Sequence, residues 1–203
     1  AHAPALRWMQ LESVGFGQYP AVLAGEVGGR VTLTNLAGFF DDPVAESALA
    51  GILALLRGID RSVLLKEAEA WEGDDMRPGF GLLSGARVVI FGHGAIGRRL
   101  GTLLGAFGCT LDTFGSDWTA EALDAALEKA DVVVAIAPHT PLTAGAFDAA
   151  RIARMKPGAI FANLGRGSLL DEDAMAAALA EGRLGGAVLD VTAEEPLPRG
   201  HVF

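Results

Sequence analysis

Cationic residues are scarce in this 203-residue chain. Lysine and arginine number 16 against 25 aspartates and glutamates, which leaves a formal net charge of −9. A surface of that sign repels phosphate backbones and anionic headgroups, so we expect neither a nucleic-acid nor a membrane partner. The longest apolar run, Ala48 to Leu56, ends at Arg57 and is too short to span a bilayer.

Cysteine is nearly absent as well. The single Cys109 excludes an internal disulfide and a thiolate metal cluster, and we predict no metal site. Cys109 follows an apolar helical pattern, so we expect a buried thiol rather than a reactive one. The chain opens without a basic-then-apolar signal segment, and we therefore expect the reducing cytoplasm.

Glycine, by contrast, is abundant, and many of the 27 glycines lie where an expected strand meets an expected helix. From residue 87 onward, apolar runs of strand length alternate with helical periodicity. Such alternation predicts an α/β fold with a doubly wound parallel sheet. The expected strands are Arg87–Phe91, Thr110–Phe114, Asp131–Ala137, Ala159–Leu164 and Gly186–Asp190, and the expected helices are Ile96–Phe107, Ala120–Lys129, Ala146–Met155 and Asp171–Glu181.

The first eighty residues follow another pattern. Arg7–Leu11 and Val31–Thr34 are typical of strands, and a glycine-rich stretch separates them. One long helix is expected from Asp42, as N-cap before Pro43, to about Trp71. Its apolar stripe comprises Ala45, Ala48, Leu49, Ile52, Leu53 and Leu56. We predict that residues 1–43 are a remnant of another domain and that residues 44–203 form one domain with the linking helix.

The turn GHGAIG at residues 92–97 follows a buried strand and opens an amphipathic helix. In that context a GxGxxG motif indicates dinucleotide binding. Gly92 permits a tight turn, Gly94 lets a pyrophosphate approach the backbone, and Gly97 lets helix and strand pack closely. The helix N-terminus adds N–H groups and a partial positive charge. The alternative is an ordinary glycine-rich turn.

The choice of cofactor depends on the end of the second strand, where an NAD-selective site places a carboxylate on the ribose 2′-hydroxyl. That position is Gly115, followed by Ser116, while Asp112 lies inside the strand and Asp117 two residues beyond Gly115. Without a carboxylate, nothing at this position repels a 2′-phosphate, yet no arginine or lysine is nearby in the sequence to pair with one. NAD and NADP therefore remain alternatives.

Two charged residues follow later strands. Ligands of an open parallel sheet bind beyond the carboxyl ends of its strands. Arg166 follows the fourth strand on a glycine-flanked turn, where a guanidinium can clamp a carboxylate and polarise a carbonyl. Glu195 follows the fifth strand, where a carboxylate can orient a histidine and raise its pKa for acid–base catalysis. Position alone equally allows ordinary surface charges.

Several longer motifs occur in one order: SVGFG, VAESALAGILALLR, GHGAIG, ADVVVAIAPHTPLTAG, MKPGAIFANLGRGSLLDE and GGAVLDVTAEEPLP. Together they resemble the D-isomer-specific 2-hydroxyacid dehydrogenases over nearly the whole chain. The resemblance implies a Rossmann-type domain joined to a truncated flavodoxin-like substrate domain. It also implies reversible hydride transfer between NAD(P)H and a 2-keto or 2-hydroxy acid, as in glyoxylate and hydroxypyruvate reductases.

The resemblance also assigns roles to residues. Arg166 would bind the carboxylate and the reacting oxygen of the substrate, and Glu195 would pair with a catalytic histidine. The backbone amides of Val14 and Gly15 would hold the carboxylate from the other domain. Cofactor contacts are expected at Gly92, Gly94, Ala95, Ile96, Gly97, Gly115, Ser116, Pro138, Thr143, Leu164 and Asp190.

The chain departs from the family at three places. It starts at Ala1 within the substrate domain, it stops at Phe203 before the family's catalytic histidine, and Gly115 occupies the position of the ribose acid. His93, His139 and His201 are not placed to be that histidine. We expect the sequence to be part of a longer enzyme rather than an inactive fragment, because binding a dinucleotide needs neither Arg166 nor Glu195.

Alternatives remain for assembly and for function. A homodimer is expected because the long helix packs against its twin in the family, although its stripe could instead pack on its own domain. The rival function is a non-catalytic NAD(P)-sensing module of the corepressor type. An FAD or S-adenosylmethionine site on the same turn is less favoured, because neither needs Arg166 and Glu195.

Overall fold

The computed structural model describes residues 5–12, 14–15 and 29–203. Its larger sheet has five parallel strands in the order β4-β3-β5-β6-β7. These strands are β3 (Arg87–Phe91), β4 (Thr110–Phe114), β5 (Val132–Ala135), β6 (Ile160–Asn163) and β7 (Gly186–Leu189). The prediction of an α/β fold with a doubly wound parallel sheet is confirmed, and every strand expected after residue 87 is present.

Four helices connect these strands: α6 (Ala95–Ala106), α7 (Ala120–Leu127), α8 (Ala149–Arg154) and α9 (Glu172–Ala180). The expected helix at Ala146–Met155 is too long, because Asp148 caps α8 and Phe147 forms a parallel bridge with Leu170. No helix in the described part of the chain is both long and apolar enough to cross a membrane.

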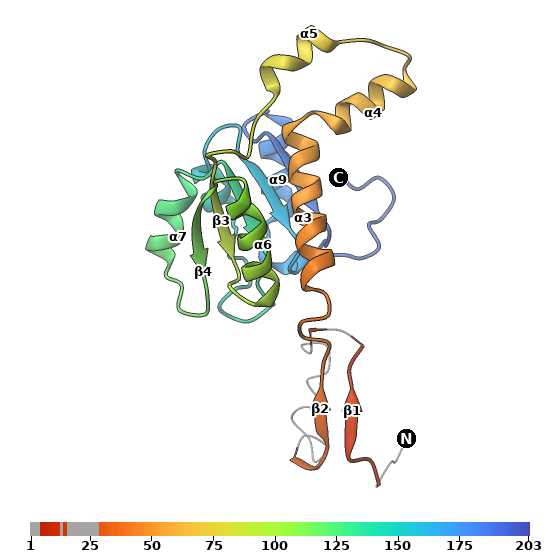
Figure 1. Cartoon of the computed structure of the whole chain (residues 1–203), viewed down its shortest axis with the longest axis vertical. Helices are drawn as coiled ribbons and strands as arrows, with labels where there is room; N and C mark the ends of the chain where they lie inside the picture. Colours follow the sequence, from red (N-terminus) through yellow and green to blue (C-terminus); the bar gives the residue numbers. More distant parts are fainter. Residues whose placement is uncertain (1–4, 13, 16–28) are drawn as a thin grey trace.

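The sheet is covered on both faces, because successive residues of a strand point to opposite sides. Val88 and Ile90 of β3 belong to one buried cluster with residues of α6 and of α3 (Asp41–Leu56). Val89 and Phe91 belong to a second cluster with residues of α7, α8 and α9. Figure 1 shows α3 and α6 packed beside each other on the first face.

The single helix expected from Asp42 to Trp71 is wrong. The chain instead forms α3 and then α4 (Ile59–Glu67), and Gly58 between them has a φ of 62°. This left-handed conformation ends a helix and suits glycine. Asp42 is not the N-cap, because α3 begins at Asp41, and the Asp42 carboxylate forms an ion pair with Arg99 of α6.

The apolar stripe of α3 packs on its own domain. Ala45, Ala48 and Ile52 are fully buried in the cluster that also holds Val88 and Ile90. The alternative stated for this stripe is therefore the one that the structure supports, and the stripe provides no argument for a dimer.

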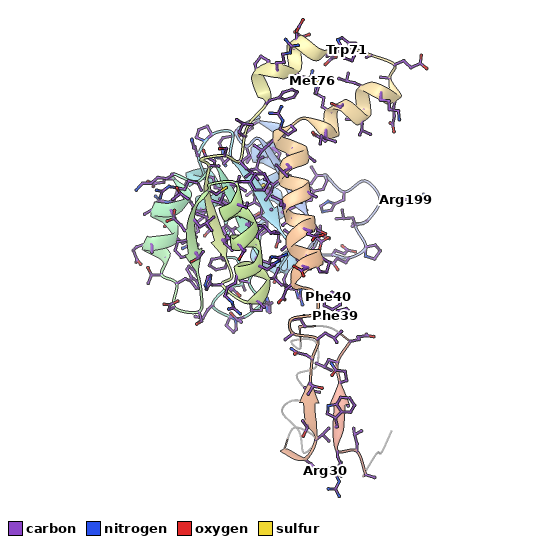
Figure 2. All side chains as sticks on the ribbon, viewed as in Figure 1. Arg30, Phe39, Phe40, Trp71, Met76 and Arg199 are labelled. Carbon is purple, nitrogen blue, oxygen red and sulfur yellow. The ribbon has the colours of Figure 1, made fainter. Side chains whose placement is uncertain are left out.

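Residues 59–80 form a projection that we name the α4–α5 arm. It contains α4, α5 (Gly73–Met76) and the 3-10 helix η1 (Arg77–Gly79), and the ion pair between Arg61 and Glu72 links α4 to the start of α5. α4 has no buried residue. Figures 1 and 2 show the arm extending beyond the sheet, with Trp71 and Met76 on its α5 side.

The N-terminal strands are β1 (Trp8–Gln10) and β2 (Thr32–Thr34), shorter than expected, and they pair in parallel. Figure 1 shows this ribbon at the end of the molecule opposite the arm, and Figure 2 places Phe39 and Phe40 where it joins α3. The Thr34 hydroxyl accepts a hydrogen bond from Trp8 Nε1 at 2.9 Å and donates one to Gln10 Oε1 at 2.7 Å.

Cys109 is half-buried, as part of the packing between α6 and the sheet. Its Sγ donates to the Leu83 carbonyl at 3.2 Å, and burial raises the pKa of the thiol. The protonated thiol therefore acts as a small packing group.

Candidate functional site

A cavity of about 550 Å³ lies at the carboxyl edge of the sheet. The strand order changes direction between β3 and β5, which is the point where open parallel sheets bind ligands. The walls of the cavity come from the turns after β3, β5 and β6 and from the segment that precedes α3. The lining residues are Val14, Gly15, Asn35, Ala37, Gly38, Asp41, Gly92, Gly94, Ala95, Ile96, Gly97, Ile136, Pro138, His139, Thr140, Leu164, Gly165 and Arg166.

Three glycines bring the backbones of these turns together. A Cβ on Gly92 would lie 2.6 Å from the backbone nitrogen of Ala137, and one on Gly165 would lie 2.6 Å from the Ala137 carbonyl oxygen. A Cβ on Gly97 would lie 2.0 Å from the Gly92 carbonyl oxygen. The turns after β3, β5 and β6 are therefore packed backbone against backbone, which fixes the shape of the cavity floor.

Gly94 is different from these three glycines. Its φ of −78° and ψ of −165° are open to any residue, and a Cβ there would meet no heavy atom within 4 Å. Side chains of Thr119, Asp148 and Asp171 cap α7, α8 and α9, whereas α6 starts at Gly94 without a side-chain cap. The start of α6 thus offers its first N–H groups to an open space in the cavity.

Arg166 is positioned by a buried amide. Asn163 is fully buried at the end of β6, its Nδ2 donates to the Arg166 carbonyl at 2.9 Å, and its Oδ1 accepts from the Gly165 N–H at 3.1 Å. Among the described residues, no carboxylate oxygen lies within 4.0 Å of the exposed guanidinium, whose Nη1 donates to the Gly165 carbonyl at 2.6 Å. Most of the donors of this guanidinium are available to an anion.

The wall opposite Arg166 contains the predicted substrate residues Val14 and Gly15. A Cβ on Gly15 would lie 2.2 Å from Arg166 Nη2, so the guanidinium lies against this backbone. Asn35 Nδ2 donates to the Val14 carbonyl at 2.8 Å, and its Oδ1 accepts from the Ala37 N–H at 3.2 Å. Because a peptide group is planar and trans, Asn35 also sets the direction of the Gly15 N–H. Asn35 is not among the site residues predicted from the sequence.

The turn after β5 carries Pro138, which lines the cavity, and Thr143, which does not. Thr143 is 8% exposed; its hydroxyl donates to the Pro138 carbonyl at 2.7 Å and accepts from the Thr140 N–H at 2.9 Å. Thr143 therefore holds the lining residues in place. His139 Nδ1 lies 2.7 Å from Ser168 Oγ, which joins this turn to the one that carries Arg166.

Glu195 and Asp190 lie outside the cavity lining. The exposed Glu195 carboxylate accepts the Thr192 N–H at 3.0 Å. The backbone at Thr192 lies close to the Arg166 turn, since a Cβ on Gly167 would be 2.1 Å from the Thr192 carbonyl carbon. The two loops with the predicted catalytic residues are thus in backbone contact, with Arg166 facing the cavity and Glu195 facing solvent.

Gly115 and Ser116, at the end of β4, also lie outside the cavity lining. They border the glycine turn, because the Gly92 N–H donates to the Phe114 carbonyl at 2.9 Å. Arg98, which is distant from Gly115 in the sequence, lies beside the same glycine turn, because its Nη1 donates to the His93 carbonyl at 3.1 Å. Arg98 is on the first turn of α6, and its side chain therefore reaches back to a residue that precedes the helix.

Comparison with known proteins agrees with this geometry. Residues 49–203 match the D-isomer specific 2-hydroxyacid dehydrogenase, NAD binding domain. The chain is 33% identical over 196 residues to glyoxylate/hydroxypyruvate reductase A of Serratia proteamaculans, which covers 91% of this chain and 60% of that protein. The chain therefore spans about three fifths of the length of such relatives.

Two solved structures resemble the fold closely. The NAD-dependent formate dehydrogenase of Staphylococcus aureus, in complex with NAD, superposes with a TM-score of 0.83 at 26% identity and covers 98% of this chain and 62% of its own. A D-isomer specific 2-hydroxyacid dehydrogenase of Xanthobacter autotrophicus Py2, in complex with NADPH and MES, gives 0.77 at 27% identity over 97% of this chain and 64% of its own. The chain belongs to the D-isomer-specific 2-hydroxyacid dehydrogenase family, and residues 49–203 are its NAD-binding domain.

Proposed function

We propose that the chain is the cofactor-binding part of an oxidoreductase that transfers a hydride between NAD(P)H and a 2-keto or 2-hydroxy acid, as glyoxylate/hydroxypyruvate reductases do. One observation carries the proposal: the Arg166 guanidinium and the glycine turn at 92–97 line one cavity. A dinucleotide requires only the turn. A cation without a carboxylate partner among the described residues suits a second, anionic ligand beside the cofactor.

The residues of the glycine turn fit a dinucleotide. The open space at Gly94 and the uncapped start of α6 suit the pyrophosphate, next to Ala95 and Ile96. Pro138 and Leu164 line the part of the cavity nearer Arg166, where the nicotinamide would lie. When bound, this cofactor supplies or accepts the hydride.

Arg166 and the Val14–Gly15 backbone, which lie against each other, would bind the substrate acid together. The guanidinium would pair with the carboxylate and polarise the C2 oxygen, and the amides of Val14 and Gly15 would donate to the same carboxylate. Asn35 would keep that backbone in position through its bond to the Val14 carbonyl. Glu195 would orient a histidine, a role for which its exposed carboxylate is available.

We also propose that residues 1–43 belong to a separate substrate domain. In the described part of that segment, β1 and β2 pair only with each other. A two-stranded sheet is marginally stable alone, so the ribbon fits the edge of a larger structure. A cytoplasmic location is proposed as well, which suits a chain with one cysteine.

A homodimer is the proposed assembly, formed through the α4–α5 arm rather than the stripe of α3. Leu64 is 65% exposed and Trp71 94% exposed, and Ile59 and Val63 are each more than half exposed. All four side chains belong to the projecting arm, where a second copy would cover them. Light scattering on the full-length protein should give twice the chain mass, and a monomer mass would remove this proposal.

The activity is tested by NADH and NADPH oxidation with glyoxylate, hydroxypyruvate, pyruvate and phenylpyruvate, using the full-length protein. Turnover of at least one acid is expected. Tight dinucleotide binding with no turnover on any of them would instead favour the non-catalytic NAD(P)-sensing module.

A further inference from the structure

We propose that Asp117 acts as the ribose carboxylate and makes the site select NADH over NADPH. This inference rests on the proposed dinucleotide site. The residue at the usual position of that acid is Gly115, which has no side chain. Asp117 fills the gap, because its Oδ1 lies 3.2 Å from where a Cβ of Gly115 would be.

The location of this carboxylate is adjacent to the cofactor turn. The same Cβ position on Gly115 lies 3.8 Å from the Cβ of His93, which is the second residue of the glycine turn. The hydrogen bond from the Gly92 N–H to the Phe114 carbonyl, at 2.9 Å, ties the end of β4 to that turn. Asp117 therefore occupies the corner where the adenosine ribose lies in this fold.

The Asp117 carboxylate is available for a ligand. It is exposed, and it makes no hydrogen bond and no ion pair with any other described residue. An ionised carboxylate is only an acceptor, so it suits the 2′- and 3′-hydroxyls of NADH, which are donors. A 2′-phosphate has no donor to offer at neutral pH and places negative charge beside negative charge.

Arg98 is a cation that a hydrogen bond holds at the glycine turn. Its guanidinium would attract a 2′-phosphate, but its Nη1 is bonded to the His93 carbonyl at 3.1 Å. It forms no ion pair with Asp117 among the described residues, so the carboxylate stays free to accept hydrogen bonds from a ligand. Asp117 lies in the space of the missing Gly115 side chain, whereas the Arg98 guanidinium is bonded to the His93 backbone.

The test compares dissociation constants of NADH and NADPH, measured by calorimetry on the full-length protein. NADH should bind at least about 10-fold more tightly than NADPH, since like charges in contact are strongly unfavourable. Asp117→Asn should lower that preference at least about 10-fold, mainly by improving NADPH binding. Asp173→Asn, which removes an exposed charge from α9, is the matched control and should leave the preference unchanged.

A wild-type preference for NADPH, or the same preference in Asp117→Asn as in the wild type, would overturn this inference while leaving the proposed function intact. Failure of both dinucleotides to bind would overturn the proposed function and this inference with it. Because Asp117 is exposed and bonds to no described residue, its replacement should not affect folding, and circular dichroism checks this.

Discussion

The β3–β7 sheet and the α4–α5 arm both contain large apolar side chains, but these side chains are buried in the sheet and exposed in the arm. Val88 and Ile90 in the sheet are fully buried, whereas Leu64 and Trp71 in the arm are 65% and 94% exposed. Burial of apolar area stabilises a fold by roughly 25 cal/mol per Å². The sheet therefore gains this stabilisation within the chain, whereas these arm residues contribute little of it.

The comparison extends to the cavity. Its described lining comes from the turns of the sheet and from residues 14–41, and no residue of the arm contributes to it. Changes in the sheet and its turns should therefore alter stability or ligand binding, whereas changes in the arm should alter only association.

Leu100→Ala should produce the largest effect. Leu100 is fully buried between α6 and the sheet, and its truncation should lower the free energy of unfolding by about 2–5 kcal/mol. Leu64→Ala in the arm is the matched control and should change it by less than about 0.5 kcal/mol under monomeric conditions. Urea denaturation measures both, and equal losses would contradict the division between sheet and arm.

Arg166→Ala should lower kcat/KM for the 2-keto acid by about 10²–10³-fold, because it removes a charged donor for the reacting oxygen. NADH binding should remain within about twofold, since Arg166 is not part of the glycine turn. Arg199→Ala, in the exposed C-terminal loop seen in Figure 2, should leave both unchanged. An unchanged kcat/KM in Arg166→Ala would remove its assigned role.

Trp71→Ala should weaken the dimer about 30-fold, because a buried interface tryptophan commonly contributes about 2 kcal/mol. NADH binding per chain should stay the same. Analytical ultracentrifugation over a concentration series gives the dissociation constant. If the variant associates as tightly as the wild type, the arm is not the interface.

Asp131→Asn should give the smallest effect. It should lower the free energy of unfolding by about 1 kcal/mol at pH 7, because it weakens one hydrogen bond from the backbone and removes a partly exposed ion pair. Burial raises the pKa of Asp131, but hydrogen bonds from Lys156 Nζ at 2.6 Å and the Arg87 N–H at 2.8 Å lower it below 3.8 overall. A lowered folded pKa contributes stability above the unfolded pKa and loses it as pH falls through the folded one. Urea midpoints of the variant and the wild type should therefore differ at pH 7 and converge as the pH falls through the lowered folded pKa of Asp131.

Local patterns accounted for the sheet and the cofactor turn. Strands β3 and β4 have the predicted bounds, and for β3 the reason is that a continuous apolar run ended by glycine is a specific signal. The break at Gly58 was missed because glycine inside an apolar helical pattern is usually tolerated. Gly58 has a left-handed conformation, and the side chains of Phe80 and Met76 pack close to it. No local sequence pattern shows this contact.

Only those residues of the site that follow a strand were predicted from the sequence. Arg166 and the glycine turn meet in one cavity because both follow parallel strands. Asn35 was not predicted, and Asp117 was noted without a role, because their importance depends on contacts made in three dimensions, with the Val14 carbonyl and with the space above Gly115. The pairing of Glu195 with a histidine stays a prediction.

Gly94→Leu tests the central claim, that the cavity holds a dinucleotide on the glycine turn, most directly. Apart from Gly94 and its two neighbours in the chain, no heavy atom lies within 4 Å of a Cβ at Gly94, so the variant should fold with an unchanged urea midpoint while its side chain occupies the pyrophosphate space. We predict that NADH binding, measured by calorimetry, weakens at least about 100-fold, and that Gly105→Leu, an equally open position on α6, has no such effect. A folded Gly94→Leu protein that binds NADH as tightly as the wild type would contradict the account.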